Sequence, residues 1–194
     1  MKIIDLGHRS FISTWALQHE LLAKRIDNRI PDTLLLVEHP PVITKGRGAS
    51  DRDILSRRFP LFEIERGGKA TYHGPGQIVG YPIVDLGPLR RIKAFVCHLE
   101  EVLIRSLHHF DIAAERKEGA TGVWTRGKKI ASIGIAVKKN VSYHGFSLNV
   151  NTDLSHYGSI LPCGFESSVI TSMKEILNCS IDISQVRQEI ARQI

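Results

Sequence analysis

The sequence predicts a single mixed α/β domain over residues 1–194. Three observations lead to this prediction. The length suits one domain, which can bury about 70% of the surface that its unfolded chain exposes. Hydrophobic residues make up 42% and charged residues 24%, as in an ordinary globular protein rather than a disordered or fibrous one. Strand-like and helix-like patterns alternate, and no repeat, linker or low-complexity segment interrupts them.

The first elements expected along the chain are one helix and two strands. Residues 10–26 have apolar side chains in helical register, and Ser10 is the expected N-cap. Residues 33–37 (TLLLV) predict a short buried strand that ends before Pro40-Pro41. A loop-rich stretch with six glycines between positions 46 and 76 follows. Residues 78–86 predict the next strand.

The second half of the chain carries the clearest periodic signal. Apolar residues at positions 92, 95, 96, 99, 103, 107 and 110 recur at helical spacing and predict an amphipathic helix over 92–110. Two shorter helices are expected over 167–177 and 184–193.

A β-hairpin is expected between these helices, with strands 129–138 and 141–150 and a turn at Lys139-Asn140. In the second strand, alternation places His144 on the apolar face with Phe146. In the first strand, it places Lys129 on one face with three apolar residues, Ala131, Ile133 and Ile135. If the turn is centred near residue 139, His144 falls opposite Gly134, to within one residue.

The composition excludes several classes of protein. Three cysteines cannot form a fully paired disulfide framework, and their spacing matches no metal finger. No apolar stretch approaches the roughly 20 residues needed to span a bilayer, and the first ten residues carry charges where a signal peptide is apolar. The net charge is +6, from 26 basic and 20 acidic residues, without a long basic run. Such an excess fits either a solvated surface or an acidic partner. We therefore expect a cytoplasmic protein.

A glycine-rich segment at 66–77, RGGKATYHGPGQ, is the first candidate for a functional site. Five of its twelve residues are Gly or Pro. Glycines let backbone N–H groups approach a ligand closely, while Thr71, Tyr72 and His73 add hydroxyl and imidazole groups. The alternative is a hairpin connection in which the glycines only turn the chain.

Cys163 is the second candidate, in the sequence Leu161-Pro162-Cys163-Gly164. The helix expected near Ser167 would favour the thiolate through the partial positive charge at its N-terminus. The alternative is a small buried hydrophobic residue, which suits Cys97 and Cys179 well.

Lys129 and His144 in the hairpin are the third candidates. A desolvated lysine amine has a lowered pKa and can act as a base near neutral pH. The alternative for Lys129 is an edge position with its ammonium in water. For His144, the alternative is a hydrogen-bonded core histidine.

Motifs in four regions of the chain, 38–44, 66–77, 122–150 and 162–164, resemble in their order the lipoyl(octanoyl) transferases of lipoate biosynthesis, the LipB family. RGGKATYHGPGQ is identical to the family pattern RGG-x-x-TYHGPGQ at each fixed position. The others are EHPPVIT at 38–44, then GVW, KIASIG and HGFSLNV at 122–124, 129–134 and 144–150, and PCG at 162–164. The resemblance spans roughly residues 34 to 175.

The resemblance implies a fold like that of the biotin and lipoate protein ligases, a mixed sheet flanked by helices. It implies an acyltransferase in which Cys163 forms an acyl thioester and Lys129 activates the cysteine. His73 would lie close to these two residues and His144 would be a supporting residue. No cofactor or metal is implied. Ser147 replaces a common alanine and Ile43 a common aromatic residue, which leaves chain-length preference open. The residues that match the acyl pocket are Arg66, Gly67, Gly68, Lys69, Ala70, Thr71, Tyr72, His73, Ser132, Ile133, Gly134, Gly145, Phe146 and Ser147.

The partners implied are octanoyl-acyl carrier protein as donor and lipoyl domains as acceptors. These domains belong to the E2 subunits of 2-oxoacid dehydrogenases and to the glycine cleavage H protein. Neither nucleic acid nor membrane is expected as a partner, and the absence of heptads suggests a monomer. Two alternatives stay open: an ATP-dependent lipoate–protein ligase, which needs no cysteine nucleophile, and a non-catalytic module that binds acyl groups or nucleic acid.

Overall fold

The computed structural model describes residues 1–87, 91–164 and 166–194, without the side chain of Cys163. The strands are β1 (Lys2–His8), β2 (Thr33–Glu38), β3 (Val42–Lys45), β4 (Leu61–Glu63), β5 (Ala70–His73), β6 (Gln77–Ile83), β7 (Glu115–Lys117), β8 (Ala120–Thr125), β9 (Lys128–Lys138) and β10 (Val141–Asn149). The α-helices are α1 (Phe11–Ile26), α2 (Ile92–His108), α3 (Met173–Leu177) and α4 (Ile183–Gln193). The 3₁₀ turns are η1 (Asp51–Asp53), η3 (Leu154–Ser159), η4 (Pro162–Gly164) and η5 (Ser167–Val169).

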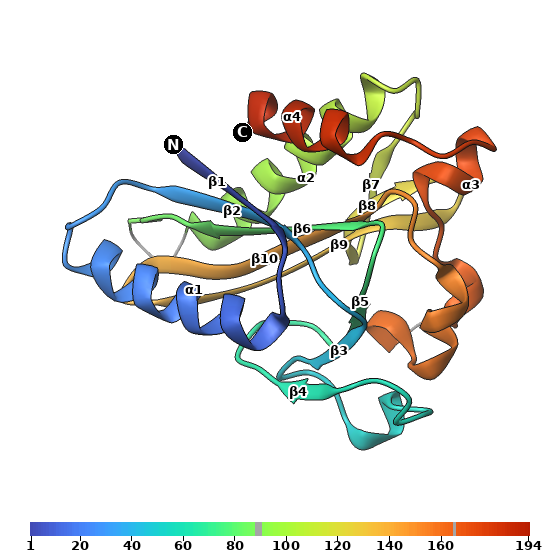
Figure 1. The fold of residues 1–194 in the computed structure, drawn as a ribbon, viewed down its shortest axis with the longest axis horizontal. Helices are drawn as coiled ribbons and strands as arrows, with labels where there is room; N and C mark the ends of the chain where they lie inside the picture. Colours follow the sequence, from blue (N-terminus) through green and yellow to red (C-terminus); the bar gives the residue numbers. More distant parts are fainter. Residues whose placement is uncertain (88–90, 165) are drawn as a thin grey trace.

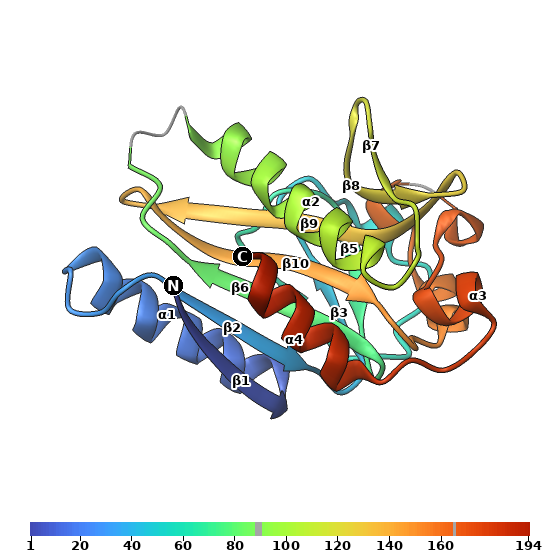
Figure 2. The same ribbon diagram turned by 90° about the horizontal axis from the view of Figure 1, so that it is seen from above.

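Two sheets and their covering helices form the architecture. The large sheet has the strand order β1-β2-β6-β10-β9-β8-β7, and β3 is the centre of a small sheet with the order β4-β3-β5. In the large sheet only β1 and β2 pair in parallel among the described strands. Helices α2 and α4 cover one face of the large sheet, while α1 and the small sheet lie on the other (Figures 1 and 2). The predicted mixed sheet flanked by helices is confirmed.

The main core lies between the large sheet and helices α2 and α4. Leu99, Leu103 and Leu107 of α2 are fully buried there, one helical turn apart, together with Phe146 of β10. Burying one such side chain contributes roughly 1.5–3 kcal/mol. The periodic pattern over 92–110 therefore predicted this helix correctly, to within two residues at its C-terminal end.

The ends of α1 and of the hairpin also follow from local sequence. Ser10 caps α1, because its Oγ accepts a hydrogen bond from the backbone N–H of Ser13. Lys139 and Asn140 both have positive φ, 47° and 66°, as a two-residue type I′ turn requires. Gly145 faces Gly134 in the β9–β10 pair, one residue from the predicted register. The predicted hairpin is confirmed.

Several predicted segments differ from the structure. The loop-rich stretch contains β3, β4 and β5, three- and four-residue strands that are too short to show a period. The strand predicted over 78–86 ends at Ile83. The helix predicted over 167–177 is wrong in its first half, where η5 and an extended segment precede the five-residue α3. Cys97 and Cys179 are exposed, so the interpretation of both as buried hydrophobic residues is wrong.

No helix within the described part of the chain is both long and apolar enough to cross a membrane.

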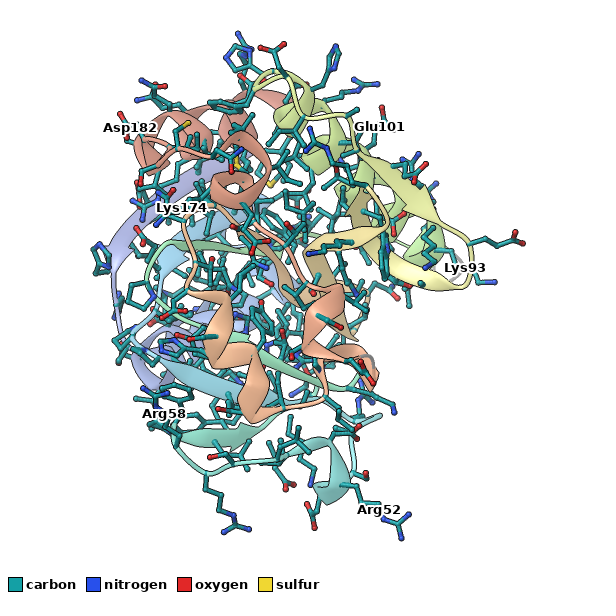
Figure 3. The ribbon with its side chains drawn as sticks, turned by 90° about the vertical axis from the view of Figure 1, so that its right-hand side faces the viewer. Arg52, Arg58, Lys93, Glu101, Lys174 and Asp182 are labelled. Atoms are coloured by element: carbon teal, nitrogen blue, oxygen red, sulfur yellow. The ribbon has the colours of Figure 1, made fainter. Side chains whose placement is uncertain are left out.

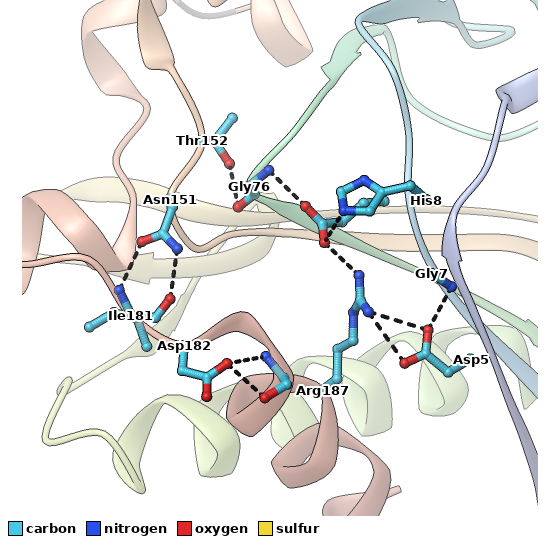
Figure 4. A network of polar contacts seen from close by, with 11 residues as sticks. Asp5, Gly7, His8, Gly76, Asn151, Thr152, Ile181, Asp182 and Arg187 are labelled. Atoms are coloured by element: carbon cyan, nitrogen blue, oxygen red, sulfur yellow. Dashed lines mark hydrogen bonds and ion pairs between the residues drawn. The ribbon is translucent and has the colours of Figure 1, made fainter.

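A buried ion pair connects α4 to the glycine-rich segment (Figure 4). Arg187 Nη2 of α4 donates to Glu38 Oε1 at 2.6 Å, and the Glu38 side chain is only 5% exposed. Arg187 Nη1 also lies 3.3 Å from Asp5 Oδ2 in β1. The second carboxylate oxygen of Glu38 accepts a hydrogen bond from the backbone N–H of Gly76. Gly76 O in turn accepts from Asn151 N–H, so helix α4, strands β1 and β2, the residue before β6 and the segment after β10 meet at this point.

Arg187→Ala should destabilise the protein by about 2–4 kcal/mol, because the buried Glu38 carboxylate would lose its charged partner. Urea unfolding at neutral pH measures this change. Arg105→Ala is the matched control: Arg105 of α2 and its partner Glu101 are 62% and 37% exposed, so the loss of their ion pair should cost less than about 1 kcal/mol. Equal destabilisation by the two variants would contradict this account of the Arg187–Glu38 pair.

Candidate active site

Lys129 lies near the start of β9, where a β-bulge changes the direction of its side chain. Val123 of β8 faces Ala131, but the next residue, Trp124, faces Lys129, so β9 has one extra residue here, Ile130. Because Val123 and Trp124 point to opposite faces, so do Ala131 and Lys129. The prediction that Lys129 shares a face with Ala131, Ile133 and Ile135 is wrong. The bulge places Lys129 on the opposite face of the sheet, with Ser132.

The Lys129 side chain is buried, with 3% of its surface exposed. Its Nζ lies 5.8 Å from the centre of the Trp124 ring. Gly122 leaves the space that the lysine occupies: a Cβ at this position would lie 2.6 Å from Lys129 Cε. A solvated surface position for this lysine is therefore excluded.

The segment that carries Cys163 runs past the start of β9. The N–H of Thr171 donates to the backbone carbonyl of Lys129, and Ile170 forms a parallel bridge with Lys129. At the other end of the segment, the N–H of Leu161 donates to the carbonyl of Asp53. The turn η4, with Cys163 at its centre, is therefore held between β9 and η1. The Cys163 side chain itself lies outside the described part of the structure.

The expected helix N-terminus behind Cys163 is absent from the described segment 166–172. Only the three-residue turn η5 stands there, and the chain is extended from Ile170 until α3 begins at Met173. A single 3₁₀ turn has a far smaller dipole than a helix. The argument that a helix dipole favours the Cys163 thiolate is therefore wrong.

A cavity lies between the large sheet, the small sheet and α1. The space that the centre of a water molecule can occupy in it is about 40 Å³, so the cavity is narrow. Predicted pocket residues from four segments line it, namely Arg66, Gly68, Thr71, His73, Ser132, Ile133, Gly134, Gly145, Phe146 and Ser147, together with the predicted supporting residue His144. Sequence reasoning missed four further lining residues, Phe11, Ile64, Val79 and Tyr81.

Four predicted pocket residues do not line the cavity: Gly67, Lys69, Ala70 and Tyr72. Ala70 and Tyr72 alternate with Thr71 along β5, so they point away from the cavity into a second core under the small sheet. The missed residues Phe11, Val79 and Tyr81 gave no signal in the sequence, because an apolar residue in a helix or strand is ordinary core.

A chain of buried hydrogen bonds connects His73 to the Cys163 segment. The Gln77 Nε2 group donates to Asn149 Oδ1, so Gln77 Oε1 is free to accept the proton on His73 Nδ1, at 2.7 Å. Asn149 Nδ2 then donates to the carbonyl of Thr171. Burial lowers the pKa of His73 to about 3. His73 is therefore a neutral imidazole at physiological pH.

Arg66 is buried beside His73 and is held by main-chain and side-chain oxygens. Its Nη2 donates to both the carbonyl and the hydroxyl of Thr44, at 2.8 and 3.0 Å, and its Nη1 to Gly67 O. The loop backbone is attached to the large sheet as well, because Gly67 N–H donates to Ile135 O. The glycine-rich segment is thus hydrogen-bonded to both the small sheet and the large sheet, so its role is not limited to connecting two strands.

His144 breaks the alternation of β10. Its φ of 55° lies in the left-handed region, which is uncommon for a residue other than glycine. Its N–H donates to Gln18 of α1, and its Nε2 lies 3.1 Å from Glu65 Oε2. The side chain therefore faces α1 and the cavity, and its predicted position on the apolar face with Phe146 is wrong. Burial lowers the pKa of His144 to about 4, although Glu65 opposes this effect.

Residues 11–194 match the sequence model of the lipoyl protein ligase A/B catalytic domain. The chain belongs to this family. The octanoyltransferase of Alkaliphilus metalliredigens is 46% identical over 199 residues, covering 98% of this chain and 91% of the relative. The octanoyltransferase of Caldicellulosiruptor bescii is 47% identical over 200 residues, covering 98% of this chain and 88% of the relative. The predicted resemblance to the lipoyl(octanoyl) transferases is confirmed.

Solved lipoate and biotin protein ligases share the fold at low sequence identity. The bipartite lipoate protein ligase of Thermoplasma acidophilum, studied with its E2 lipoyl domain, superposes with a TM-score of 0.78 at 16% identity. The alignment covers 99% of this chain and 81% of the ligase. The biotin protein ligase of Aquifex aeolicus has a TM-score of 0.61 at 15% identity, covering 99% of this chain and 68% of the other. The predicted biotin and lipoate protein ligase-like fold is confirmed.

His39 is a buried histidine next to the cavity. Its Nδ1 lies 2.7 Å from the carbonyl of Arg9, so it carries the proton, and its Nε2 accepts from the hydroxyl of Tyr81. Burial lowers the pKa of His39 to about 4 and raises the pKa of Tyr81. Tyr81 therefore presents a neutral ring to the cavity.

His39 should make the stability of this family member depend on pH. Between pH 6.5 and 4 the unfolded chain binds a proton at His39 that the folded chain excludes, so this stability is lost as the pH falls through that window. In urea unfolding at pH 5 and 6, His39→Gln should lower the slope of stability against pH by about 1 kcal/mol per unit. His98→Gln, an exposed position on α2, should keep the wild-type slope. An unchanged slope in His39→Gln would contradict the prediction.

Proposed function

We propose that this chain transfers an octanoyl group from acyl carrier protein to a lysine of a lipoyl domain, through a thioester on Cys163. Relatives that are 46–47% identical over nearly the whole chain are named octanoyltransferases. The observation that carries the mechanism is Lys129: a buried lysine on the cavity face of β9, attached through its backbone to the segment of Cys163.

The first half-reaction is an exchange of thioesters. The Cys163 thiolate attacks the carbonyl carbon of the octanoyl thioester, and the bond from that carbon to the carrier sulfur breaks. The carrier leaves as a thiolate and takes up a proton. The new thioester has about the same energy as the old one, so the step consumes no ATP. The ammonium of Lys129 favours the thiolate before the attack.

The second half-reaction forms an amide. The neutral amine of the acceptor lysine attacks the enzyme thioester, the new C–N bond forms, and the bond to Cys163 Sγ breaks. The attacking nitrogen loses a proton in this step, and Lys129 in its neutral form is the base that we assign to it. The amide is more stable than a thioester, which drives the transfer.

The cavity provides a place for the acyl chain. Lys129 and Ser132 lie on the same face of β9, and the cavity begins at Ser132 and extends along the strand to Gly134. Phe11, Ile64, Val79 and Phe146 supply apolar walls. At roughly 3.3 Å per residue, this part of β9 matches a medium-length alkyl chain lying along the strand.

A lipoate–protein ligase is the alternative within the fold. The fold does not separate the two activities, because solved lipoate protein ligases share it. The intact Pro162-Cys163-Gly164 sequence favours the transferase, since adenylate chemistry needs no thiol. The presence of both Cys163 and Lys129 likewise weighs against a non-catalytic binding module.

The donor and the acceptor are large partners, so we expect them to dock around the Cys163 turn. Figure 3 views the molecule from the side on which η3, η4 and η5 lie. Arg52 and Arg58 project from the lower part of this side, and Lys174 lies above them. These charges agree with the net charge of +6 and would attract an acidic carrier protein. In the same proposal, the acceptors are the lipoyl domains of 2-oxoacid dehydrogenase E2 subunits and of the glycine cleavage H protein. The protein acts as a monomer in the cytoplasm.

Incubation with octanoyl-acyl carrier protein, without ATP, should add one octanoyl group to Cys163. Peptide mass spectrometry locates the adduct. Cys163→Ser should lose the adduct and at least a hundredfold in transfer rate, because a hydroxyl is far less ionised than a thiol at neutral pH. Cys97→Ser and Cys179→Ser are the matched controls, since both thiols are exposed. An adduct on either of them, or one that persists in Cys163→Ala, would refute the proposed mechanism.

Lys129→Arg should separate the two half-reactions. Arginine keeps the positive charge but cannot give up its proton, so acylation of Cys163 should partly survive while amide formation fails. Lys129→Ala should slow both steps. The measurements are single-turnover acylation by mass spectrometry and transfer to a lipoyl domain, with Lys128→Ala, the exposed neighbour, as control. Wild-type rates in Lys129→Ala would show that this lysine has no part in the reaction.

A further inference from the structure

Lys69 belongs to the glycine-rich segment, but its side chain leaves the cavity and lies on the turn η4. A Cβ added to Gly164 would stand 2.8 Å from Lys69 Nζ, 3.0 Å from its Cδ and 3.1 Å from its Cε. The lysine chain therefore occupies the space in which any other residue at position 164 would have its side chain. Its ammonium lies against the residue that follows Cys163.

Asp53 fixes both Lys69 and the turn. Its Oδ1 lies 3.4 Å from Lys69 Nζ, and its backbone carbonyl accepts the N–H of Leu161, two residues before Cys163. The Asp53 side chain is only 6% exposed, and its Oδ2 accepts from the N–H and hydroxyl of Ser50. The hydrogen bond from the Ser50 N–H lowers the pKa of Asp53, and the charge of Lys69 adds to this effect. Asp53 is therefore an anion that holds the ammonium at the turn.

We infer that Lys69 is a positioning residue that provides a second positive charge at the Cys163 turn and favours the thiolate there. The inference rests on the proposed role of Cys163 as the nucleophile. It assigns the two lysines different tasks. Lys129 is buried in the sheet and takes the proton of the acceptor amine, whereas Lys69 is 44% exposed and is paired with Asp53.

The other ionisable groups around η4 do not supply this charge. His73 at the end of β5 is neutral, because burial lowers its pKa to about 3. Glu166, three residues after Cys163 in the chain, is exposed and carries the opposite charge. Lys129 favours the thiolate before the first attack, but in the proposed mechanism it must be neutral to take the proton of the acceptor amine, so it does not supply a constant charge. Since the helix expected behind Cys163 is not there, an ammonium replaces the helix dipole as the source of positive potential.

The pH dependence of Cys163 alkylation tests the inference directly. We would measure the rate with iodoacetamide from pH 6 to 10 in a Cys97→Ser, Cys179→Ser background, so that only Cys163 reacts. Lys69→Gln should move the midpoint up by about 0.5–1 pH unit, which lowers the rate at pH 7 about three- to tenfold. Lys69→Arg should restore the wild-type midpoint, because it keeps the charge. High salt should shrink the difference between wild type and Lys69→Gln.

Lys45→Gln is the matched control. Lys45 faces Ala70 across the small sheet and pairs with Asp51 and Glu63, so its loss also removes a paired ammonium from this sheet. It should leave the midpoint unchanged. Lys69→Met carries the same expectation as Lys69→Gln and replaces it if that variant does not fold. A wild-type midpoint in Lys69→Gln or Lys69→Met would overturn the inference, even where octanoyl addition to wild-type Cys163 supports the proposed function. Absence of that adduct would instead overturn the proposed function.

Discussion

The side-chain amide of Gln77 connects the segments that meet at the site. It is fully buried, its Oε1 accepts from His73, and its Nε2 lies within hydrogen-bond distance of Tyr72 O, Asn149 Oδ1 and Tyr157 OH. In a medium of low dielectric constant, each broken bond of such a network leaves a polar group unsatisfied at a cost of about 1–3 kcal/mol. The glycine-rich segment, β10 and the segment that follows Cys163 are therefore held in one relative arrangement.

This arrangement also determines the charge of the groups around the cavity. Three histidines around it, His39, His73 and His144, are buried and have a lowered pKa, so the cavity walls are close to neutral. The guanidinium of Arg66 is turned to oxygens of Thr44 and Gly67. An apolar chain can then be bound without the removal of charges from water. The positive groups that the mechanism uses stand beyond the cavity, at the start of β9 and at the turn η4.

The fold by itself does not select the chemistry. A lipoate protein ligase from Thermoplasma acidophilum has the same architecture at 16% identity. The mechanism that we propose for the present chain combines Lys129 on the cavity face of β9 with Cys163 in the turn η4, a thioester route that needs no activated acid. The same sheet can therefore support two ways of forming one amide bond. In our proposal, Cys163 in the turn η4 selects the thioester route.

The sequence by itself determined the periodic elements and the motifs. The long amphipathic helix α2, the hairpin β9–β10 with its Lys139-Asn140 turn, and the family all follow from spacing and residue type, because local patterns and motif order are properties of the linear chain. Most of the residues that line the cavity were also among those predicted from the motifs.

Only the tertiary structure decided which way the side chains point. Alternation placed Lys129 and His144 on the wrong faces, since the extra residue Ile130 and a left-handed φ arise from pairing with β8 and contact with α1. The direction of Lys69 depends equally on Asp53 and Gly164, which are distant in the sequence. The small sheet escaped prediction because its short strands are stable only when paired with one another and packed under the cavity. Strand pairing and packing are long-range interactions, so a local sequence pattern does not predict them.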